Sequence, residues 1–297
     1  MSGTNTGRVA IVTGAGRGIG RAEAMTLAAE GASVVVNDVG GAADGSGSDA
    51  GPASEVVAEI RALGGKAVAN TDDISEWDGA QNLINTAVEE FGRLVVLVNN
   101  AGILRDRMIV NMSIEEFDAV VKVHLRGTFC TSRWAAAYWR EQVKAGETVD
   151  GRIINTTSSS GIYGNVGQSN YGAAKAGIAA MTIILSKELG RYGVTVNALA
   201  PAAATRLTAP GGAGELSEEM QASLDPQWVA NVTAWLASPA AAGVTGRVID
   251  VSGVRIAIAE GWNRGPEAPT PADIAGVGAT IEELLKTAAP VSEMPGL

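Results

Sequence analysis

Short apolar runs alternate along this chain with longer alanine-rich or amphipathic stretches. An apolar run that ends at Gly, Asn or Asp predicts a buried strand, since strands of a covered parallel sheet are hydrophobic on both faces. Such runs occupy residues 8–12, 33–37, 66–70, 94–98, 152–156, 194–199 and 247–251. The stretches between them predict helices at 18–30, 53–63, 75–91, 113–140, 169–191 and 226–237.

This alternation predicts one α/β domain, a doubly wound parallel sheet of the Rossmann type with helices on both faces. We expect the domain to span residues 1–253, followed by a proline-containing tail at 254–297 to which the sequence assigns no role. The Gly-, Ser- and Asp-rich stretch 39–52 predicts an exposed insertion.

Composition excludes several classes of function. The formal net charge of -10 makes nucleic acid a poor partner, because phosphate binding needs a basic face. One cysteine, Cys130, and one histidine, His124, rule out an internal disulfide and a Cys/His zinc cluster, so no metal site is expected. No uncharged apolar run reaches the ~18 residues of a membrane span, and we expect a soluble, cytoplasmic protein with no membrane partner.

A glycine-rich loop with the sequence TGAGRGIG, residues 13–20, joins the first predicted strand to the first helix. Its glycines allow a tight turn and close approach of a pyrophosphate, and the helix start offers free N–H groups. The cofactor contacts predicted in this loop are Gly14, Arg17, Gly18, Ile19 and Gly20. An ordinary glycine-rich turn is the alternative, but a strand before and a helix after the loop favour a dinucleotide site.

Asp38 follows the second predicted strand, 18 residues after Gly20. A carboxylate there can accept hydrogen bonds from the adenine ribose hydroxyls and repels a 2′-phosphate, which predicts NAD rather than NADP. Arg17 instead favours NADP, because a basic side chain in the loop would attract that phosphate. We give Asp38 more weight. The amides of Asn99 and Asn100, after the fourth strand, can satisfy buried backbone groups beside the cofactor.

Tyr171 and Lys175 lie four residues apart in a predicted helix and so share a face, and Ser158 comes 13 residues before Tyr171. Oxidation of an alcohol needs a proton acceptor, and a phenol of pKa about 10 serves only if a nearby positive charge favours its phenolate. Ser158 can hold the substrate oxygen; Ser159 and Ser160 are alternatives that we expect to bond local backbone. Alone, Tyr-x-x-x-Lys is more often a solvated helix face, but beside a dinucleotide loop it indicates catalysis.

Together these motifs resemble the short-chain dehydrogenase/reductase family over nearly the whole chain. The resemblance implies that Tyr171 is the acid/base, that Lys175 binds the nicotinamide ribose and that Ser158 positions substrate. It also implies a homodimer or homotetramer. The further cofactor contacts that it implies are Asp73, Ile74, Asn100, Ala101, Gly102, Tyr171, Lys175, Pro201 and Thr205.

Four segments resemble one branch of the family more closely, the dehydrogenase domain of peroxisomal multifunctional enzymes of type 2, or 17β-hydroxysteroid dehydrogenases of type 4. These segments are residues 35–41, 100–106, 123–127 and 160–165. The branch oxidises (3R)-hydroxyacyl-CoA thioesters, and some members oxidise steroid alcohols. We therefore expect hydride transfer between a secondary alcohol of either type and NAD, with Arg105 and Arg107 as candidates to meet CoA phosphates.

Other interpretations stay open. The family usually carries Asn where His124 stands, so His124 has either a relay or a structural role. An NADPH-dependent 3-oxoacyl-carrier-protein reductase is an alternative enzyme, against which Asp38 argues. A non-catalytic NAD-sensing protein of the same fold would not need Ser158, Tyr171 and Lys175. A serine hydrolase is disfavoured because no G-x-S-x-G elbow is present.

Overall fold

The computed structural model describes residues 3–203, 217–261, 263–290 and 292. They form one eight-stranded sheet in the order β3-β2-β1-β4-β5-β6-β7-β8. Its strands are β1 (Val9–Thr13), β2 (Ser33–Asn37), β3 (Lys66–Asn70), β4 (Val96–Asn99), β5 (Gly151–Thr156), β6 (Val194–Pro201), β7 (Val248–Val251) and β8 (Ile256–Ala259). All neighbours are parallel except β7 and β8, which confirms the predicted doubly wound sheet.

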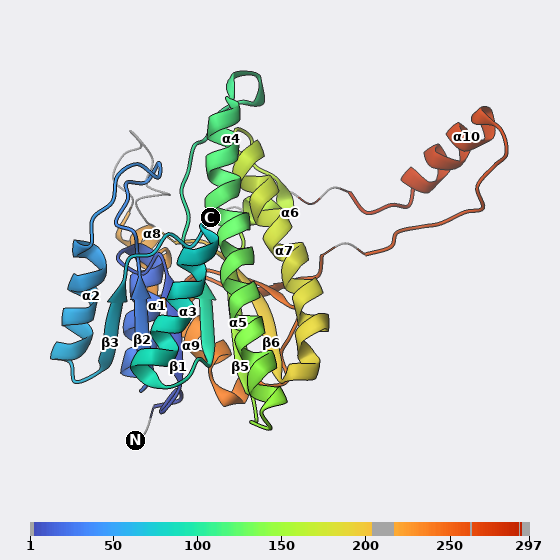
Figure 1. Cartoon of the computed structure of the whole chain (residues 1–297). Helices are drawn as coiled ribbons and strands as arrows, with labels where there is room; N and C mark the ends of the chain where they lie inside the picture. The colour runs from blue at the N-terminus through green and yellow to red at the C-terminus, as the bar shows by residue number, and fades with distance from the viewer. Residues whose placement is uncertain (1–2, 204–216, 262, 291, 293–297) are drawn as a thin grey trace.

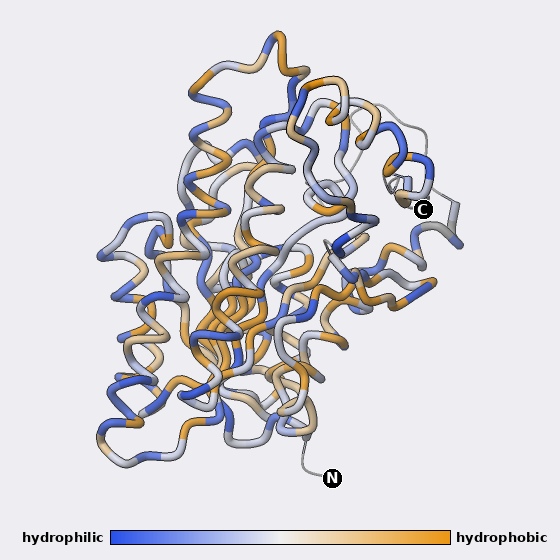
Figure 2. Tube along the Cα trace, turned by 90° about the vertical axis from the view of Figure 1, so that its right-hand side faces the viewer, coloured by the Kyte–Doolittle hydropathy of each residue, from blue (hydrophilic) through white to orange (hydrophobic). Residues whose placement is uncertain are grey.

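Helices cover both faces of the sheet (Figure 1). One face is covered by α1 (Gly18–Ala29), α2 (Gly51–Ala62) and α9 (Gln227–Ala237), and the other by α3 (Trp77–Phe91), α5 (Gly127–Lys144) and α7 (Ser169–Leu189). Alternate residues of β1 serve the two cores, because Ala10 and Val12 face one cluster and Val9 and Ile11 the other. Figure 2 shows the hydrophobic residues concentrated in these stacked strands.

Several other helices and helical turns complete the described secondary structure. They are α4 (Ile114–Val121), α6 (Ser159–Tyr163), α8 (Glu218–Ser223), α10 (Ile274–Leu285), a π-helical turn (Lys122–Arg126) and the 3₁₀ turns Ile109–Asn111, Gly190–Tyr192 and Pro239–Ala241. The π turn sits between α4 and α5. The helix expected at 113–140 is therefore two α-helices joined by a wider turn, and it continues to Lys144.

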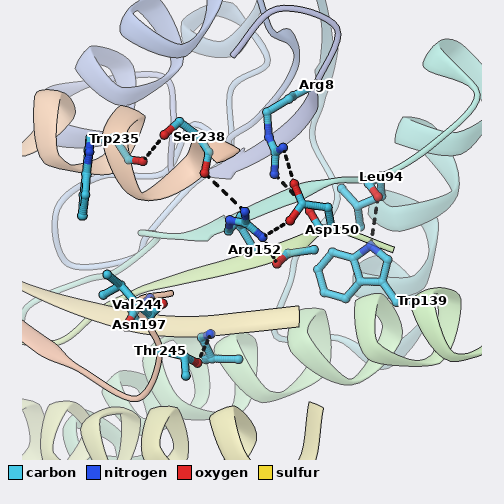
Figure 3. A network of polar contacts seen from close by, with 12 residues as sticks. Arg8, Leu94, Trp139, Asp150, Arg152, Asn197, Trp235, Ser238, Val244 and Thr245 are labelled. Carbon is cyan, nitrogen blue, oxygen red and sulfur yellow. Dashed lines mark hydrogen bonds and ion pairs between the residues drawn. The ribbon is translucent and has the colours of Figure 1, made fainter. Parts of the chain in front are cut away.

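An ion-pair network of two buried arginines and a partly exposed carboxylate lies at the amino-terminal ends of the central strands (Figure 3). Asp150 accepts from Arg8 Nη1 at 2.7 Å and from Arg152 Nη1 at 2.6 Å. Arg152 also donates to the carbonyl O of Ser238 at 3.3 Å. The network ties the start of β1 to the start of β5 and to the end of α9, at the opposite edge from the strand ends that carry the motifs. Because the network lies at that opposite edge, we assign it a structural role.

The tail differs from the sequence expectation. β8 pairs with β7, so the sheet extends past Gly253, where the sequence placed the end of the domain. An extended arm then leads to α10, which lies away from the body of the molecule and has no buried residue (Figure 1). Among the described residues, no helix is long and apolar enough to cross a membrane.

Candidate active site

The glycine-rich loop turns from β1 into α1 at the carboxyl edge of the sheet. Gly14 has φ +64°, and a side chain there would press on the backbone of Ala101, so glycine is required. The first turn of α1 has no acidic residue, and the side chain of its N-cap, Arg17, makes no capping hydrogen bond. The positive end of the helix is thus open to an anion, and this cradle fits the pyrophosphate of a dinucleotide.

Asp38 sits beside this loop at the end of β2. Its Oδ2 accepts from Gly16 N at 2.8 Å, and its Oδ1 accepts from Gly40 N at 2.6 Å. The carboxylate therefore orders two backbone turns as well as facing the cavity. Each oxygen keeps a further lone pair, so acceptance from ribose hydroxyls remains open to it.

The two asparagines after β4 have different partners. Asn100 Nδ2 donates to the carbonyl oxygens of Thr13 at 3.0 Å and Gly14 at 3.2 Å, which fixes the glycine loop. Asn99 Nδ2 donates to Asn155 Oδ1 at 2.9 Å, which joins β4 to β5. Asn100 thus satisfies backbone groups, as expected, whereas the side chain of Asn99 bonds other side chains, which corrects the expectation.

A cavity of about 440 Å³ lies above this edge. Most of the predicted cofactor residues line it: Gly14, Arg17, Gly18, Ile19, Asp38, Asp73, Ile74, Asn100, Ala101 and Gly102. The cavity thus brings together segments from the ends of β1, β2, β3 and β4. Residues 41–48 of the insertion contribute a further side, which the sequence did not indicate.

The other predicted cofactor residues lie elsewhere. Gly20 is buried in α1, where a side chain would collide with the carbonyl O of Gly14, so its role is close packing. Pro201 ends β6, beside Val251 of β7. Thr205 lies outside the described residues.

Ser158 and Tyr171 meet where β5 and α7 approach. Ser158 is the N-cap of α6, and its Oγ accepts from Ser160 N at 3.1 Å. Burial raises the pKa of Tyr171, and a hydrogen bond from Ser158 opposes this rise, while the charge of Asp106 adds to it. The hydroxyl of Ser158 is therefore placed to favour the phenolate.

Lys175 is almost fully buried behind Tyr171. Its Nζ donates to the carbonyl O of Thr156 at 2.5 Å and lies 5.5 Å from the centre of the Tyr171 ring. Burial lowers the pKa of Lys175 to about 7. The three residues predicted to be catalytic thus converge at the end of β5.

His124 occupies the π turn and packs under the same residues. Its ring stands edge-on to that of Tyr171, with 5.1 Å between the centres, and it fills the space beside Gly102. Its Nε2 lies 2.8 Å from the carbonyl O of Ile103 and 3.1 Å from Ile103 N, so this atom has a partner in either tautomer, whereas the buried Nδ1 has none among the described residues. Burial, together with the charge of Lys175, lowers the pKa of His124 to about 3.

A polar link near Tyr171 was not indicated by the sequence. Ser160 Oγ donates to Gln168 Oε1 at 2.7 Å, and Gln168 Nε2 donates to Asp106 Oδ2 at 2.8 Å. Ser160 thus bonds a side chain rather than local backbone, which corrects the expectation. Buried Asn170 accepts from Tyr171 N at 2.7 Å and donates to the carbonyl O of Arg105 at 2.9 Å. These contacts join loops far apart in sequence, and no local pattern signals them.

The model of the short chain dehydrogenase family matches residues 8–210. The chain belongs to this family. A hydroxyacyl-CoA dehydrogenase of Mycobacterium tuberculosis is 50% identical over 267 residues, or 86% of this chain and 81% of that protein. The peroxisomal multifunctional enzyme type 2 of Mus musculus is 46% identical over 230 residues, which are 77% of this chain but 30% of that protein.

Solved structures agree with the sequence relatives. The crystal structure of a short chain dehydrogenase from Mycobacterium avium has 52% sequence identity and a TM-score of 0.88, with 99% of this chain and 100% of that chain covered. The resemblance to the family and to its multifunctional branch is confirmed. The chain is accordingly an oxidoreductase that acts on the hydroxyl group of a secondary alcohol, or on the matching ketone, with a nicotinamide cofactor.

Proposed function

We propose that this enzyme transfers a hydride between NAD and a secondary alcohol of the 3-hydroxyacyl-CoA or hydroxysteroid type. The observation that carries the proposal is the convergence of Ser158, Tyr171 and Lys175 at the end of β5. They sit at the sheet edge that also forms the cavity bordered by Asp38. Ligands of doubly wound sheets bind at this edge.

The residues divide the chemistry between them. Bound NAD would supply the acceptor for the hydride of the carbinol carbon. Tyr171 accepts the hydroxyl proton through its phenolate oxygen, and Ser158 holds the substrate oxygen by a hydrogen bond. Lys175 supplies positive charge that lowers the free energy of the phenolate. In the reverse direction, Tyr171 returns the proton to the carbonyl oxygen.

The choice of NAD rests on Asp38, whose carboxylate borders the cavity and would repel a 2′-phosphate. Arg17 also lines the cavity, and its exposed guanidinium is the observation that favours the alternative, an NADPH-dependent 3-oxoacyl-carrier-protein reductase. The ratio of kcat/KM for NAD to that for NADP distinguishes the two. A preference for NADP would refute the assignment of Asp38.

The substrate class draws on the Mycobacterium tuberculosis relative, which is a hydroxyacyl-CoA dehydrogenase. Apolar side chains of Met108, Ile109, Val110 and Val166 are exposed near one another, since Arg107 N donates to the carbonyl O of Gly167 at 2.8 Å and joins their segments. An apolar surface beside the catalytic residues suits an acyl chain or a steroid. This surface does not distinguish an acyl chain from a steroid.

The experiment that tests the proposal is a screen of 3-hydroxyacyl-CoA thioesters of both configurations and of hydroxysteroids, with NADH formation followed by absorbance. Oxidation of a (3R)-hydroxyacyl-CoA or of a hydroxysteroid is the expected result. Tight NAD binding without turnover of any alcohol would instead favour an NAD-sensing protein.

A homodimer or homotetramer also belongs to the proposal. Phe129 of α5 and Ile184 of α7 are about half exposed, and a groove between these helices is lined by apolar and charged residues. Apolar helix faces of this kind favour association. Sedimentation of the wild type and of Phe129→Asp tests it, because a charge there should lower the oligomeric mass.

Two further expectations from the sequence, the domain boundary and the cellular location, remain proposals. The division into a domain at 1–253 and a tail at 254–297 is tested by limited proteolysis, now with β8 as part of the sheet. The cytoplasmic location is tested by fractionation of cells.

A further inference from the structure

Residues 39–49 connect β2 to α2 as a closed loop, which we call the strap. Its base is held by Asp49 N, which donates to the carbonyl O of Val39 at 2.9 Å, and its tip by Ala42 N, which donates to the carbonyl O of Ser46 at 2.7 Å. The strap rises above the carboxyl ends of the strands (Figure 1). It is thus an ordered structure with internal bonds, although most of its residues are exposed.

The tip of the strap is bound to the segment that follows β4. Leu104 N donates to the carbonyl O of Ala43 at 3.1 Å, and Arg105 Nε donates to the carbonyl O of Asp44 at 2.9 Å. Gly45 packs against the side chain of Ile103. Three adjacent contacts therefore fasten the tip at a point remote from its base.

Topology determines what the strap crosses. In the sheet, β1 lies between β2 and β4. A connection from the end of β2 to the segment after β4 must therefore pass across the end of β1, where the glycine loop begins. The cavity lies between the two, since it is lined by the glycine loop and by the strap residues Val39, Gly41, Ala42, Ala43, Gly45, Gly47 and Ser48.

We propose that the strap is the outer wall of the adenosine half of the dinucleotide site, and that Arg105 is the positioning residue that keeps it closed. This inference rests on the proposed nicotinamide-dependent function and adds a specific cause of cofactor retention. Dinucleotide leaves when the bond between Arg105 and the carbonyl O of Asp44 opens. The role differs from that expected from the sequence, in which Arg105 meets a CoA phosphate.

The chain offers a matched control two residues away. Arg107 belongs to the same segment, but its guanidinium pairs with Glu116 at 3.1 Å, and no hydrogen bond or ion pair joins its side chain to the strap among the described residues. Its side chain is 61% exposed, so removal leaves no buried group without a partner. A general loss of positive charge near the site would affect Arg105 and Arg107 alike, whereas the strap depends on Arg105.

A second variant opens the strap without touching Arg105. Gly45 has φ +86°, and a methyl group there would lie 2.9 Å from Ile103 Cδ1. Gly45→Ala is therefore strained in the closed position. It should act in the same direction as Arg105→Ala through a different contact.

The experiment measures NADH release by stopped-flow fluorescence, with excess NAD as the displacing ligand, in full-length wild type, Arg105→Ala, Gly45→Ala and Arg107→Ala. We expect release about tenfold faster in Arg105→Ala, the scale of one hydrogen bond from a charged donor, and faster release in Gly45→Ala. Arg107→Ala should match wild type. Affinity for ADP-ribose should fall with Arg105→Ala, while affinity for nicotinamide mononucleotide should not change.

Unchanged NADH release in both Arg105→Ala and Gly45→Ala, with folding verified by circular dichroism, would overturn the role of the strap. Weaker binding of a hydroxyacyl-CoA with unchanged NADH release would also overturn it, and would return Arg105 to the substrate. A wild type that binds no NADH would refute the proposed function itself, which is a distinguishable result.

Discussion

The Nζ atom of Lys175 lies 5.5 Å from the centre of the Tyr171 ring, held there by its bond to the carbonyl O of Thr156. That bond joins α7 to the end of β5. The distance between Nζ and the ring is therefore fixed by the packing at the sheet edge, and the lysine side chain is not free to move. Burial raises the pKa of Tyr171 and lowers that of Lys175, and both shifts favour the uncharged form of the side chain. The hydrogen bond from Ser158 acts against the shift at Tyr171, which makes the serine part of the acid/base unit.

Tyr171→Phe removes the proposed proton acceptor and keeps the ring in place. Turnover should fall by at least ~10²-fold, the usual scale for loss of general acid–base catalysis. NADH affinity, measured by fluorescence titration, should change little. Tyr192→Phe is the matched control, because Tyr192 lies in a 3₁₀ turn beyond α7 and stacks with Arg191. Near-normal turnover of Tyr171→Phe would refute the assignment.

Asp38→Ala should weaken NAD and improve NADP relative to it. The change removes the repulsion of a 2′-phosphate and also the acceptor for Gly16 N and Gly40 N. Because those two turns would lose their partner, we expect the KM for NAD to rise by about tenfold or more. Asp38→Asn, which keeps one acceptor oxygen, should fall between wild type and Asp38→Ala. Steady-state kinetics with both dinucleotides make the comparison, and an unchanged NAD/NADP ratio would contradict the prediction.

Much of the site follows from local sequence rules. The glycine loop was predictable because it lies between an apolar strand and the start of a helix. Asp38 was expected beside this loop because it follows a second parallel strand, which ends at the same edge of the sheet. Helical periodicity placed Tyr171 and Lys175 on one face of α7. Each of these inferences needs only a few neighbouring residues, and the family comparison supports the enzyme class to which they point.

Other features depend on contacts that no local pattern encodes. The bond between Gln168 and Asp106 joins residues 62 positions apart, and the bond between Arg105 and Asp44 joins residues 61 apart. The π turn around His124 inserts a wider turn into a region whose apolar spacing predicted a single regular helix. β8 is four residues long and begins three residues after Gly253, and so short an apolar run does not stand out from the tail.

Glu23 gives the fold a pH-dependent stability. It is fully buried in α1, where its Oε1 accepts from Thr233 Oγ1 at 2.7 Å, and its Oε2 has no hydrogen-bond partner among the described residues. Burial raises the pKa of Glu23 to about 7, although the bond from Thr233 opposes the rise. Between pH about 4.5 and 7, the native state therefore holds a proton that the unfolded state has lost, and stability falls as pH rises.

Glu23→Gln remains neutral at every pH and keeps an acceptor for Thr233. It should match wild type near pH 4.5 and exceed it at pH 8 by up to about 3 kcal/mol in free energy of unfolding, from a pKa difference of about 2.5. Urea unfolding at both pH values measures this. Parallel pH dependence of the two proteins would show that Glu23 ionises in the native state without penalty.

His124 supports a last prediction, which separates a relay role from a positioning role. With its pKa lowered to about 3, the ring is neutral near pH 7, which argues against a relay through the imidazolium. It braces Gly102 and Ile103, which line the cofactor cavity, and the edge of the Tyr171 ring. His124→Asn should therefore raise the KM for NAD and lower turnover far less than Tyr171→Phe, with an unchanged pH profile of kcat. A shifted pH profile at an unchanged KM for NAD would instead assign His124 to proton transfer.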